Sequence, residues 1–296
     1  MLSKLTMLLC MIKFSHTVFA MPFAVLATFL AANGGEGGFC GWGKLGLIVL
    51  CMVCARSVAM TFNRLADVKI DAANLRTAGR EIVTGAISSR LAWLFLLVCA
   101  AGFVLSTACF RIAYGNSWPL YLSVPVLGFI CLYSYTKRFT WLCHFWLGAS
   151  LMLSPVSAWV AVCPPDGPVL SAASLILGGA VLFWTAGFDI IYACQDIEVD
   201  RRDGLYSLPS RLGAPTALWI SRTCHSLAVM LLLLLSFEAG LGSVYLGAVV
   251  TVAILLVCEH LIVRGGRMKH ITMAFATING VISILLALAA ILDIML

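Results

Sequence analysis

The chain reads Asn63-Arg-Leu-Ala-Asp67-Val-Lys-Ile-Asp71 at the end of one apolar segment and Asp189-Ile-Ile-Tyr192-Ala-Cys-Gln-Asp196-Ile-Glu-Val-Asp200 at the end of another. Carboxylates as dense as these are costly beside a lipid bilayer unless they bind positive charge. Eight of the thirteen acidic residues lie in or near these two stretches, so the rest of the chain is almost free of acid. The two stretches therefore predict a site that holds cations at a membrane surface.

The composition around these stretches is that of a membrane protein. Of the 296 residues, 62% are hydrophobic and 11% are charged, and the mean hydropathy is +1.03. Ordinary soluble domains carry about 25% charged residues, so a soluble chain of this composition would not stay in solution. The twelve cysteines are scattered through the apolar segments, and we interpret them as small buried side chains. The net charge of +6 follows the membrane topology and does not indicate nucleic-acid binding.

Apolar segments of spanning length recur along the whole chain. A helix needs about 20 apolar residues to cross the hydrocarbon layer. Loops rich in glycine, proline or charge, such as 33–38 and 163–168, separate these segments. The apolar segments predict nine transmembrane helices, at about residues 17–33, 44–62, 91–110, 118–135, 142–162, 172–194, 215–236, 242–263 and 271–294. We interpret residues 1–16, where Lys13 and His16 interrupt a short apolar run, as a cytoplasmic helix at the membrane surface.

The basic residues predict the orientation, because cytoplasmic loops carry an excess of lysine and arginine. Two of the nineteen, Lys44 and Arg111, lie on one side of the predicted spans. Fifteen lie on the other side, namely Lys4, Lys13, Arg64, Lys69, Arg76, Arg80, Arg90, Lys137, Arg138, Arg201, Arg202, Arg211, Arg264, Arg267 and Lys269. We therefore expect a multi-pass protein of the inner (cytoplasmic) membrane, with a cytoplasmic N-terminus and, after nine spans, an external C-terminus.

The spacing within the acidic stretches predicts a magnesium site. In a continuous helix, Asn63, Asp67 and Asp71 would share one face, with Arg56 on the same face seven residues earlier. Asp67 and Asp71 would repel one another unless a cation lay between them. Magnesium prefers oxygen ligands and keeps open positions for water and substrate phosphates. The second stretch has the same pattern, because Asp189, Asp196 and Asp200 would also share a face, beside Tyr192.

Basic residues beside the acids predict a phosphate ligand. Guanidinium groups match phosphate oxygens. The candidates follow each acidic stretch or lie in the loop between the fourth and fifth spans, and they are Arg76, Arg80, Lys137, Arg138 and Arg201. A diphosphate bound through magnesium is thus the expected ligand. His144 follows that same loop, and we expect it to line a cavity or lie at the membrane interface, without a catalytic role.

Longer motifs resemble those of the UbiA-type membrane prenyltransferases. The resemblance runs through residues 55–64 with Asp67, Asp71, Asn74, 76–78 and 80–81, through Ser134-Tyr-Thr-Lys-Arg-Phe-Thr140, and through 189–201 with 204–209. It covers essentially the whole chain, so we expect a single UbiA-like domain over residues 1–296. It implies an all-α fold, with nine transmembrane helices around a central cavity that opens at the cytoplasmic side.

The resemblance also implies an activity and a role for each matched residue. A polyprenyl group would pass from its diphosphate to an aromatic acid, with Mg²⁺ as cofactor. Asn63, Asp67, Asp71, Asp196 and Asp200 would hold the metal and its diphosphate, and the basic residues named above would bind diphosphate oxygens. Asp189 would assist substrate orientation or proton loss, and Tyr192 would shape the cavity. Arg56 would bind either the aromatic carboxylate or the diphosphate.

Several alternatives stay open at this point. The aromatic acid is expected to be 4-hydroxybenzoate, for ubiquinone, or 1,4-dihydroxy-6-naphthoate, for menaquinone, and another prenyl acceptor of the same family is a further alternative. A CDP-alcohol phosphotransferase also uses membrane aspartates and a metal, but its Asp-Gly-x-x-Ala-Arg signature is missing where Asp203-Gly204 continues as Leu-Tyr. A cation transporter would place its acids near the bilayer midplane, in broken helices. The acids here lie at the cytoplasmic ends of the predicted spans, beside arginines that would repel a cation.

Overall fold

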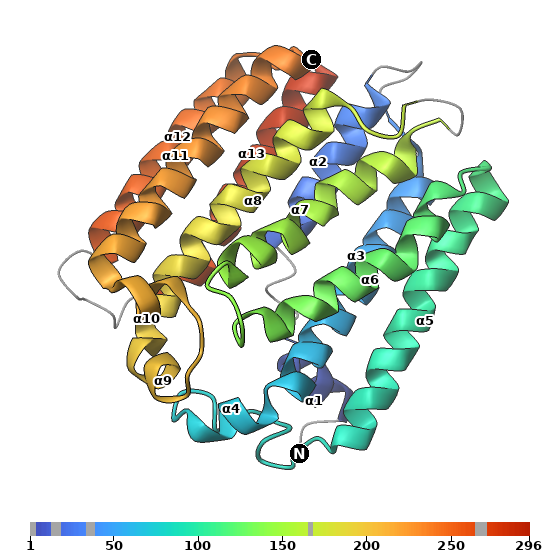
Figure 1. The fold of residues 1–296 in the computed structure, drawn as a ribbon. Coiled ribbons are helices and arrows are strands. Elements are labelled where there is room, and N and C mark those ends of the chain that lie inside the picture. Colours follow the sequence, from blue (N-terminus) through green and yellow to red (C-terminus); the bar gives the residue numbers. More distant parts are fainter. Residues whose placement is uncertain (1–3, 13–18, 34–38, 165–167, 264–270) are drawn as a thin grey trace.

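The computed structural model describes residues 4–12, 19–33, 39–164, 168–263 and 271–296, and for Leu5 and residues 271–276 it describes the backbone alone. Throughout this part of the chain the regular structure is helical, with no strand. The long helices run side by side in one bundle, and the short helices α1, α4, α9 and α10 gather at one end of it (Figure 1). The first described residues lie at that end and the last ones at the opposite end.

The helices follow the predicted spans closely. In chain order they are α1 (Lys4–Met11), α2 (Met21–Ala32), α3 (Trp42–Ala66), α4 (Val68–Ala73), α5 (Ser89–Tyr114), α6 (Trp118–Thr136), α7 (Cys143–Val162), α8 (Ala172–Ala193), the 3-10 helix η2 (Cys194–Asp196), α9 (Ile197–Arg202), α10 (Leu208–Leu212), α11 (Ala214–Ala239), α12 (Ser243–Val263) and α13 (Ile271–Met295).

Eight of these helices in the described chain are long and apolar enough to cross a membrane: α3, α5, α6, α7, α8 with its continuation, α11, α12 and α13. The first predicted span is shorter than expected, because α2 has 12 residues. At 1.5 Å per residue it measures about 18 Å, less than the hydrocarbon thickness of about 30 Å. The predicted all-α membrane fold is confirmed, and its count of nine consists of eight long helices and one short apolar helix. Lys13, Arg264, Arg267 and Lys269, which contributed to the predicted orientation, lie outside the described residues.

Local signals explain where the helices begin and end. The Ser88 hydroxyl accepts a hydrogen bond from the Leu91 N–H and caps α5, and Gly115 ends that helix in the left-handed conformation. A reciprocal pair of hydrogen bonds between Ser171 and Ser174 caps α8. These caps satisfy backbone groups that would otherwise lack partners at the helix ends.

Helix α8 carries the second acidic stretch and is packed between α7 and α11. Gly148 of α7 lies against the Leu182 carbonyl of α8, and a Cβ atom at that position would clash with it. The close approach of the two helices therefore requires glycine. At the end of the bundle where the short helices gather, α1 packs through Leu8 and Met11 on Ile82 and Ile87, which follow the first acidic stretch. Both acidic stretches are thus anchored to a packed core.

Both acidic stretches interrupt their helices, which the sequence analysis did not predict. Helix α3 ends at Ala66 and α4 begins at Val68, with Asp67 between them at φ −100° and ψ 8°. In the second stretch Asp196 adopts nearly the same conformation, φ −109° and ψ 10°, before α9. These angles lie in the sparsely populated bridge region, where many active-site residues are found. The expectation that each set of acids shares one face of a continuous helix was wrong, because the chain changes direction at one aspartate of each set.

Candidate active site

Asp67 is the most completely enclosed acid of the first stretch. Its side chain is 2% exposed, and the Lys137 ammonium lies 2.6 Å from Oδ2. Arg138 approaches Oδ1 at 3.2 Å and also donates to the Ala66 carbonyl. The Asn63 amide donates to Oδ2 at 3.3 Å. The loop between α6 and α7 therefore provides positive charge for this carboxylate, which burial alone would destabilise.

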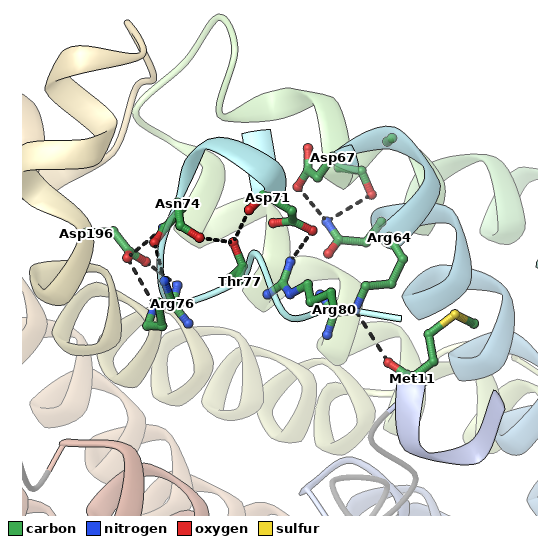
Figure 2. A network of polar contacts seen from close by, with 12 residues as sticks. Met11, Arg64, Asp67, Asp71, Asn74, Arg76, Thr77, Arg80 and Asp196 are labelled. Atoms are coloured by element: carbon green, nitrogen blue, oxygen red, sulfur yellow. Dashed lines mark hydrogen bonds and ion pairs between the residues drawn. The ribbon is translucent and has the colours of Figure 1, made fainter. Parts of the chain in front are cut away.

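Asp71 is held by the residues that follow it. Arg80 pairs with Oδ2 at 2.5 Å, and the Asp71 side chain is 6% exposed. The Thr77 hydroxyl donates to the Asp71 backbone carbonyl at 3.0 Å, which closes residues 71–80 into a compact loop. Figure 2 shows this network, with Arg80 pointing back to Asp71 and Arg64 donating to the Met11 carbonyl of α1. The loop therefore returns Arg80 to the acid that precedes it.

Arg76 joins the first stretch to the second. Its guanidinium makes two hydrogen bonds to Asp196, of 3.1 Å and 2.5 Å, and a third to the Tyr192 hydroxyl at 2.9 Å. The Asn74 amide donates to the same carboxylate at 3.3 Å (Figure 2). Partial burial opposes the charge on Arg76, but the hydrogen bond and the charge of Asp196 outweigh it and raise the pKa of the guanidinium above its usual value. Residues about 120 positions apart thus form one polar cluster.

Asp200 is held by the turn between α9 and α10. The Ser207 hydroxyl donates to its Oδ2 at 2.6 Å, while Ser207 and Ser210 cap α10 reciprocally. Gly204 adopts φ 68°, a left-handed conformation that lets the chain reverse after α9. Arg201 points to the same turn, where its Nε donates to the Ser210 carbonyl at 2.9 Å.

A cavity of about 410 Å³ lies next to this cluster. That volume falls within the usual range of ligand pockets, about 300–1,000 Å³. Most of its walls are apolar side chains of α3, α5, α6, α7 and α8, and the polar residues that line it include Arg56, Asn63, Arg64, Arg80, Asp189 and Tyr192. Within the described chain, the Arg56 Nε is buried without a hydrogen-bond partner. A buried guanidinium nitrogen in this state is suited to binding an anionic group.

A family comparison matches residues 20–290 to the UbiA prenyltransferase family. The chain belongs to this family. It is accordingly a prenyltransferase and a multi-pass membrane protein of all-α fold.

Named relatives and solved structures agree with this assignment. A 4-hydroxybenzoate octaprenyltransferase of Marinobacter nauticus is 27% identical over 86% of this chain and 82% of its own length. The enzyme of the same name from Pseudomonas aeruginosa is 31% identical over 70% of this chain and 67% of its own length. An apo UbiA homolog from Aeropyrum pernix K1 superposes with a TM-score of 0.83 at 31% identity, over 95% of this chain and 98% of that one.

A more distant structure shows the same fold with ligands. It is a UbiA homolog from Archaeoglobus fulgidus bound to GPP and Mg²⁺, with a TM-score of 0.69 at 21% identity, over 98% of this chain and 100% of that one. At 21% identity, this similarity shows that the two proteins share a fold.

The structure brings together most of the residues that the sequence singled out, namely Asn63, Asp67, Asp71, Arg76, Arg80, Lys137, Arg138, Tyr192 and Asp196. Arg56 and Asp189 line the adjoining cavity. Asp200 lies close enough to Asp196 and Lys137 to feel their charges, but its hydrogen bond comes from Ser207. Arg201 makes no described ion pair with an acid of either stretch and donates instead to the Ser210 carbonyl. This bond uses only the Nε of Arg201.

His144 is the polar residue whose environment the sequence analysis did not anticipate. It is buried, and its Nδ1 lies 2.7 Å from Asp189 Oδ2. No local pattern could have indicated this contact, because 45 residues and a helix-to-helix contact separate the two positions. Asn74 is also part of the cluster, because its amide donates to Asp196. The sequence motif contains Asn74 but does not indicate this partner.

The donor atoms around the cluster fit a magnesium ion that shares its coordination with a substrate. In the described residues, no three Asp, Glu, His or Cys side chains converge to hold a metal by themselves. Magnesium is usually held by one or two carboxylates together with substrate phosphates. Asp67, Asp71 and Asp196 offer carboxylate oxygens, and each pairs here with a flexible basic side chain that can exchange one anion for another.

Proposed function

We propose that this UbiA-family enzyme transfers a polyprenyl group from polyprenyl diphosphate to an aromatic acid, with Mg²⁺ as its cofactor, at the cluster formed by the two acidic stretches. The observation that carries the proposal is the joint binding of Asp196 by Arg76 and Asn74. It places the carboxylates and cations of both stretches beside one apolar cavity, where charged and hydrophobic parts of a substrate can bind together. We also propose that residues 1–296 form one transmembrane prenyltransferase domain.

Each part of the cluster has a role in this proposal. Asn63, Asp67, Asp71, Asp196 and Asp200 hold magnesium and its diphosphate. Magnesium, when bound, supplies positive charge that stabilises the departing diphosphate. Arg76, Arg80, Lys137 and Arg138 exchange their carboxylate partners for diphosphate oxygens, and Arg201 joins them from α9. Preorganised cations at the position where negative charge develops are the largest stabilising contribution in many enzymes.

The cavity has a separate role. Loss of diphosphate leaves an allylic carbon with cationic character, which water would capture in an open site. The apolar side chains of the cavity exclude water from it. We assign Arg56 to the carboxylate of the aromatic acid because it lines the apolar cavity and its buried Nε has no hydrogen-bond partner in the described chain. Tyr192, held by Arg76, shapes the cavity wall between the two substrates.

The acceptor we favour is 4-hydroxybenzoate, which would place the enzyme in ubiquinone biosynthesis. The names of the Marinobacter and Pseudomonas relatives support this choice. The alternative is 1,4-dihydroxy-6-naphthoate, a larger phenolic acid used for menaquinone. Both acids offer one carboxylate and an electron-rich ring that attacks ortho to a hydroxyl group.

We further propose that the cluster faces the cytoplasm in the inner membrane, with the N-terminus cytoplasmic and the C-terminus outside. Support comes from the excess of basic residues on one side of the predicted spans. The described loops that carry many of them gather with α4, α9 and α10 at one end of the bundle (Figure 1).

A parallel assay tests the function and the acceptor together. Membranes that contain the enzyme are given magnesium and one labelled polyprenyl diphosphate, with 4-hydroxybenzoate in one reaction and 1,4-dihydroxy-6-naphthoate in the other. Prenylated benzoate is the expected product, and Asp196→Ala membranes should form none. Prenylated naphthoate alone would assign the enzyme to menaquinone synthesis. No product with either acid would contradict the proposed function.

A further inference from the structure

One buried contact joins the cavity to the turn that holds Asp200. Asp189 lines the cavity, and its side chain is 20% exposed. Its Oδ2 lies 2.7 Å from Nδ1 of His144, which extends from the first turn of α7. On the other side of the imidazole, the backbone N–H of Leu208 donates to Nε2 at 3.2 Å. The imidazole thus bridges a cavity carboxylate and the start of α10.

The Leu208 contact determines which ring nitrogen carries a proton. A backbone N–H can only donate, so Nε2 must accept and carries no hydrogen in this arrangement. The remaining ring N–H is then on Nδ1, where it donates to Asp189. At many enzyme sites, the hydrogen bond at one ring nitrogen of a histidine likewise sets the tautomer and the orientation of the whole ring.

Hydrogen bonds of neighbouring residues also hold the start of α7 in place. Cys143, the residue before His144, contacts the Tyr206 carbonyl at 3.3 Å, so the start of α7 is attached to the α9–α10 turn at two points. Ser207, the residue before Leu208, binds Asp200. Within the described chain, His144 is the one hydrogen-bond partner of Asp189, and Oδ1 carries no hydrogen bond. One carboxylate oxygen is therefore fixed, while the other is available to a ligand in the cavity.

We propose that His144 is a positioning residue that holds Asp189 as the proton acceptor for the aromatic substrate, an inference that rests on the proposed function. In the transfer step the allylic C–O bond breaks and its electron pair leaves with the diphosphate. A C–C bond forms between the allylic carbon and the ring, and the acceptor loses one proton. Asp189 takes that proton through Oδ1 and later releases it to water, while His144 keeps the carboxylate oriented and does not itself contact the substrate.

Three variants at one position separate this role from simple packing. His144→Asn keeps an N–H donor close to the position of Nδ1. His144→Gln places its amide farther along the side chain, near the position of Nε2, and so keeps a partner for Leu208 but removes the donor to Asp189. His144→Ala removes both. Purified enzymes are compared for kcat and for the KM of both substrates, with thermal unfolding in detergent as a check on folding, and Asp189→Asn with and without His144→Ala completes a double-mutant cycle.

The expected result is a loss of kcat with little change in diphosphate binding. A well-placed acid–base group contributes about 10²- to 10⁴-fold to a rate, so a mispositioned one should cost roughly 10- to 100-fold in His144→Ala and His144→Gln. His144→Asn should recover most of the rate, the KM for polyprenyl diphosphate should stay within about threefold, and adding His144→Ala to Asp189→Asn should cost no more than Asp189→Asn alone.

Other results would overturn the inference. They are a kcat in His144→Ala equal to that of the wild type, a His144→Asn variant as slow as His144→Ala, or losses in the double variant that simply add. A wild-type enzyme that prenylates no aromatic acid overturns the proposed function, and the role of His144 in it as well. If the wild type prenylates its acceptor and His144→Ala has the same kcat, only the role of His144 is overturned.

Discussion

The two acidic stretches have the same local design but different surroundings. In each, an aspartate breaks the helix and a second aspartate follows four residues later, so Asp67 and Asp71 correspond to Asp196 and Asp200. In the first stretch the side chains of Asp67 and Asp71 are 2% and 6% exposed, and basic side chains contact both. In the second, Asp196 is 18% exposed, and Asp200 is held by a neutral serine hydroxyl.

The difference lies in the source of the compensating charge. The first stretch obtains its cations from its own loop and from the α6–α7 loop, as Arg80 and Lys137. In the described chain, the one basic side chain that contacts Asp196 is Arg76, which lies in the loop that follows the first stretch. A buried or half-buried charge needs a partner, so the second stretch depends on the first for its charge balance. The region of the first stretch thus supplies positive charge to both sets of acids.

The largest expected effect is the loss of one acid from either stretch. Asp67→Asn or Asp196→Asn should lower the rate of prenyl transfer by at least about 10²- to 10³-fold, the cost of removing one electrostatic group that acts on developing charge. The two variants should differ in stability, because Asp67 is more enclosed and its replacement removes the negative charge that pairs with Lys137 and Arg138. Transfer assays and thermal unfolding of the purified variants measure both effects. Wild-type turnover in Asp196→Asn would contradict the joint site.

The next effect concerns the link between the stretches. Arg76→Lys keeps the positive charge but cannot make the paired hydrogen bonds to Asp196 together with the one to Tyr192. We expect kcat/KM for polyprenyl diphosphate to fall by roughly 10-fold, since hydrogen bonds to charged groups contribute about 1.5–3 kcal/mol each and lysine retains part of the contact. Steady-state kinetics at fixed acceptor concentration measures the change. Equal kinetics for the variant and the wild type would show that the second stretch does not need this link.

A smaller effect is expected in the cavity, away from both stretches. Arg56→Ala should raise the KM for the aromatic acid by roughly 10-fold, because a charged hydrogen bond is lost, while the KM for the diphosphate stays nearly constant. Kinetics with each substrate varied in turn separates the two. A raised KM for the diphosphate instead would assign Arg56 to the diphosphate site. The cavity and the acidic stretches would then not bind separate substrates.

The smallest effect serves as a control for the second stretch. Asp203 pairs with Arg202 on the surface, and the hydrogen bond from Arg202 lowers the pKa of the Asp203 carboxyl. A lowered pKa means that any stabilisation is present at neutral pH and is lost as the pH falls through that pKa, but exposed pairs contribute little. Asp203→Asn should therefore keep prenyl transfer within about twofold of the wild type. A loss as large as that of Asp196→Asn would mean that general charge in this region, and not the placement of Asp196, matters.

The sequence predicted the long helices and the acids well, for physical reasons that can be stated. A membrane requires long apolar helices, so α3, α5, α6, α7, α8, α11, α12 and α13 could be located from apolar length alone. The expected proximity of the acids to basic residues is also present, in the Arg76–Asp196 and Arg80–Asp71 ion pairs.

The rest depended on contacts that no local pattern encodes. The helix breaks at Asp67 and Asp196 are backbone conformations that a continuous helical period hides. The contact between His144 and Asp189 requires the packing of α7 on α8. The hydrogen bond of Arg201 to Ser210 depends on the reversal of the chain at Gly204. Each of these features is set by tertiary structure, and each changes how a site residue is understood.

The most direct test of the joint site is a binding measurement without turnover. Isothermal titration calorimetry of geranyl diphosphate into purified wild type, Asp67→Asn and Asp196→Asn, each with magnesium and with EDTA, measures whether both stretches hold the same ligand. The account predicts magnesium-dependent binding to the wild type and its loss in each single variant. Wild-type affinity in either variant, or equal affinity of the wild type in EDTA, would contradict it.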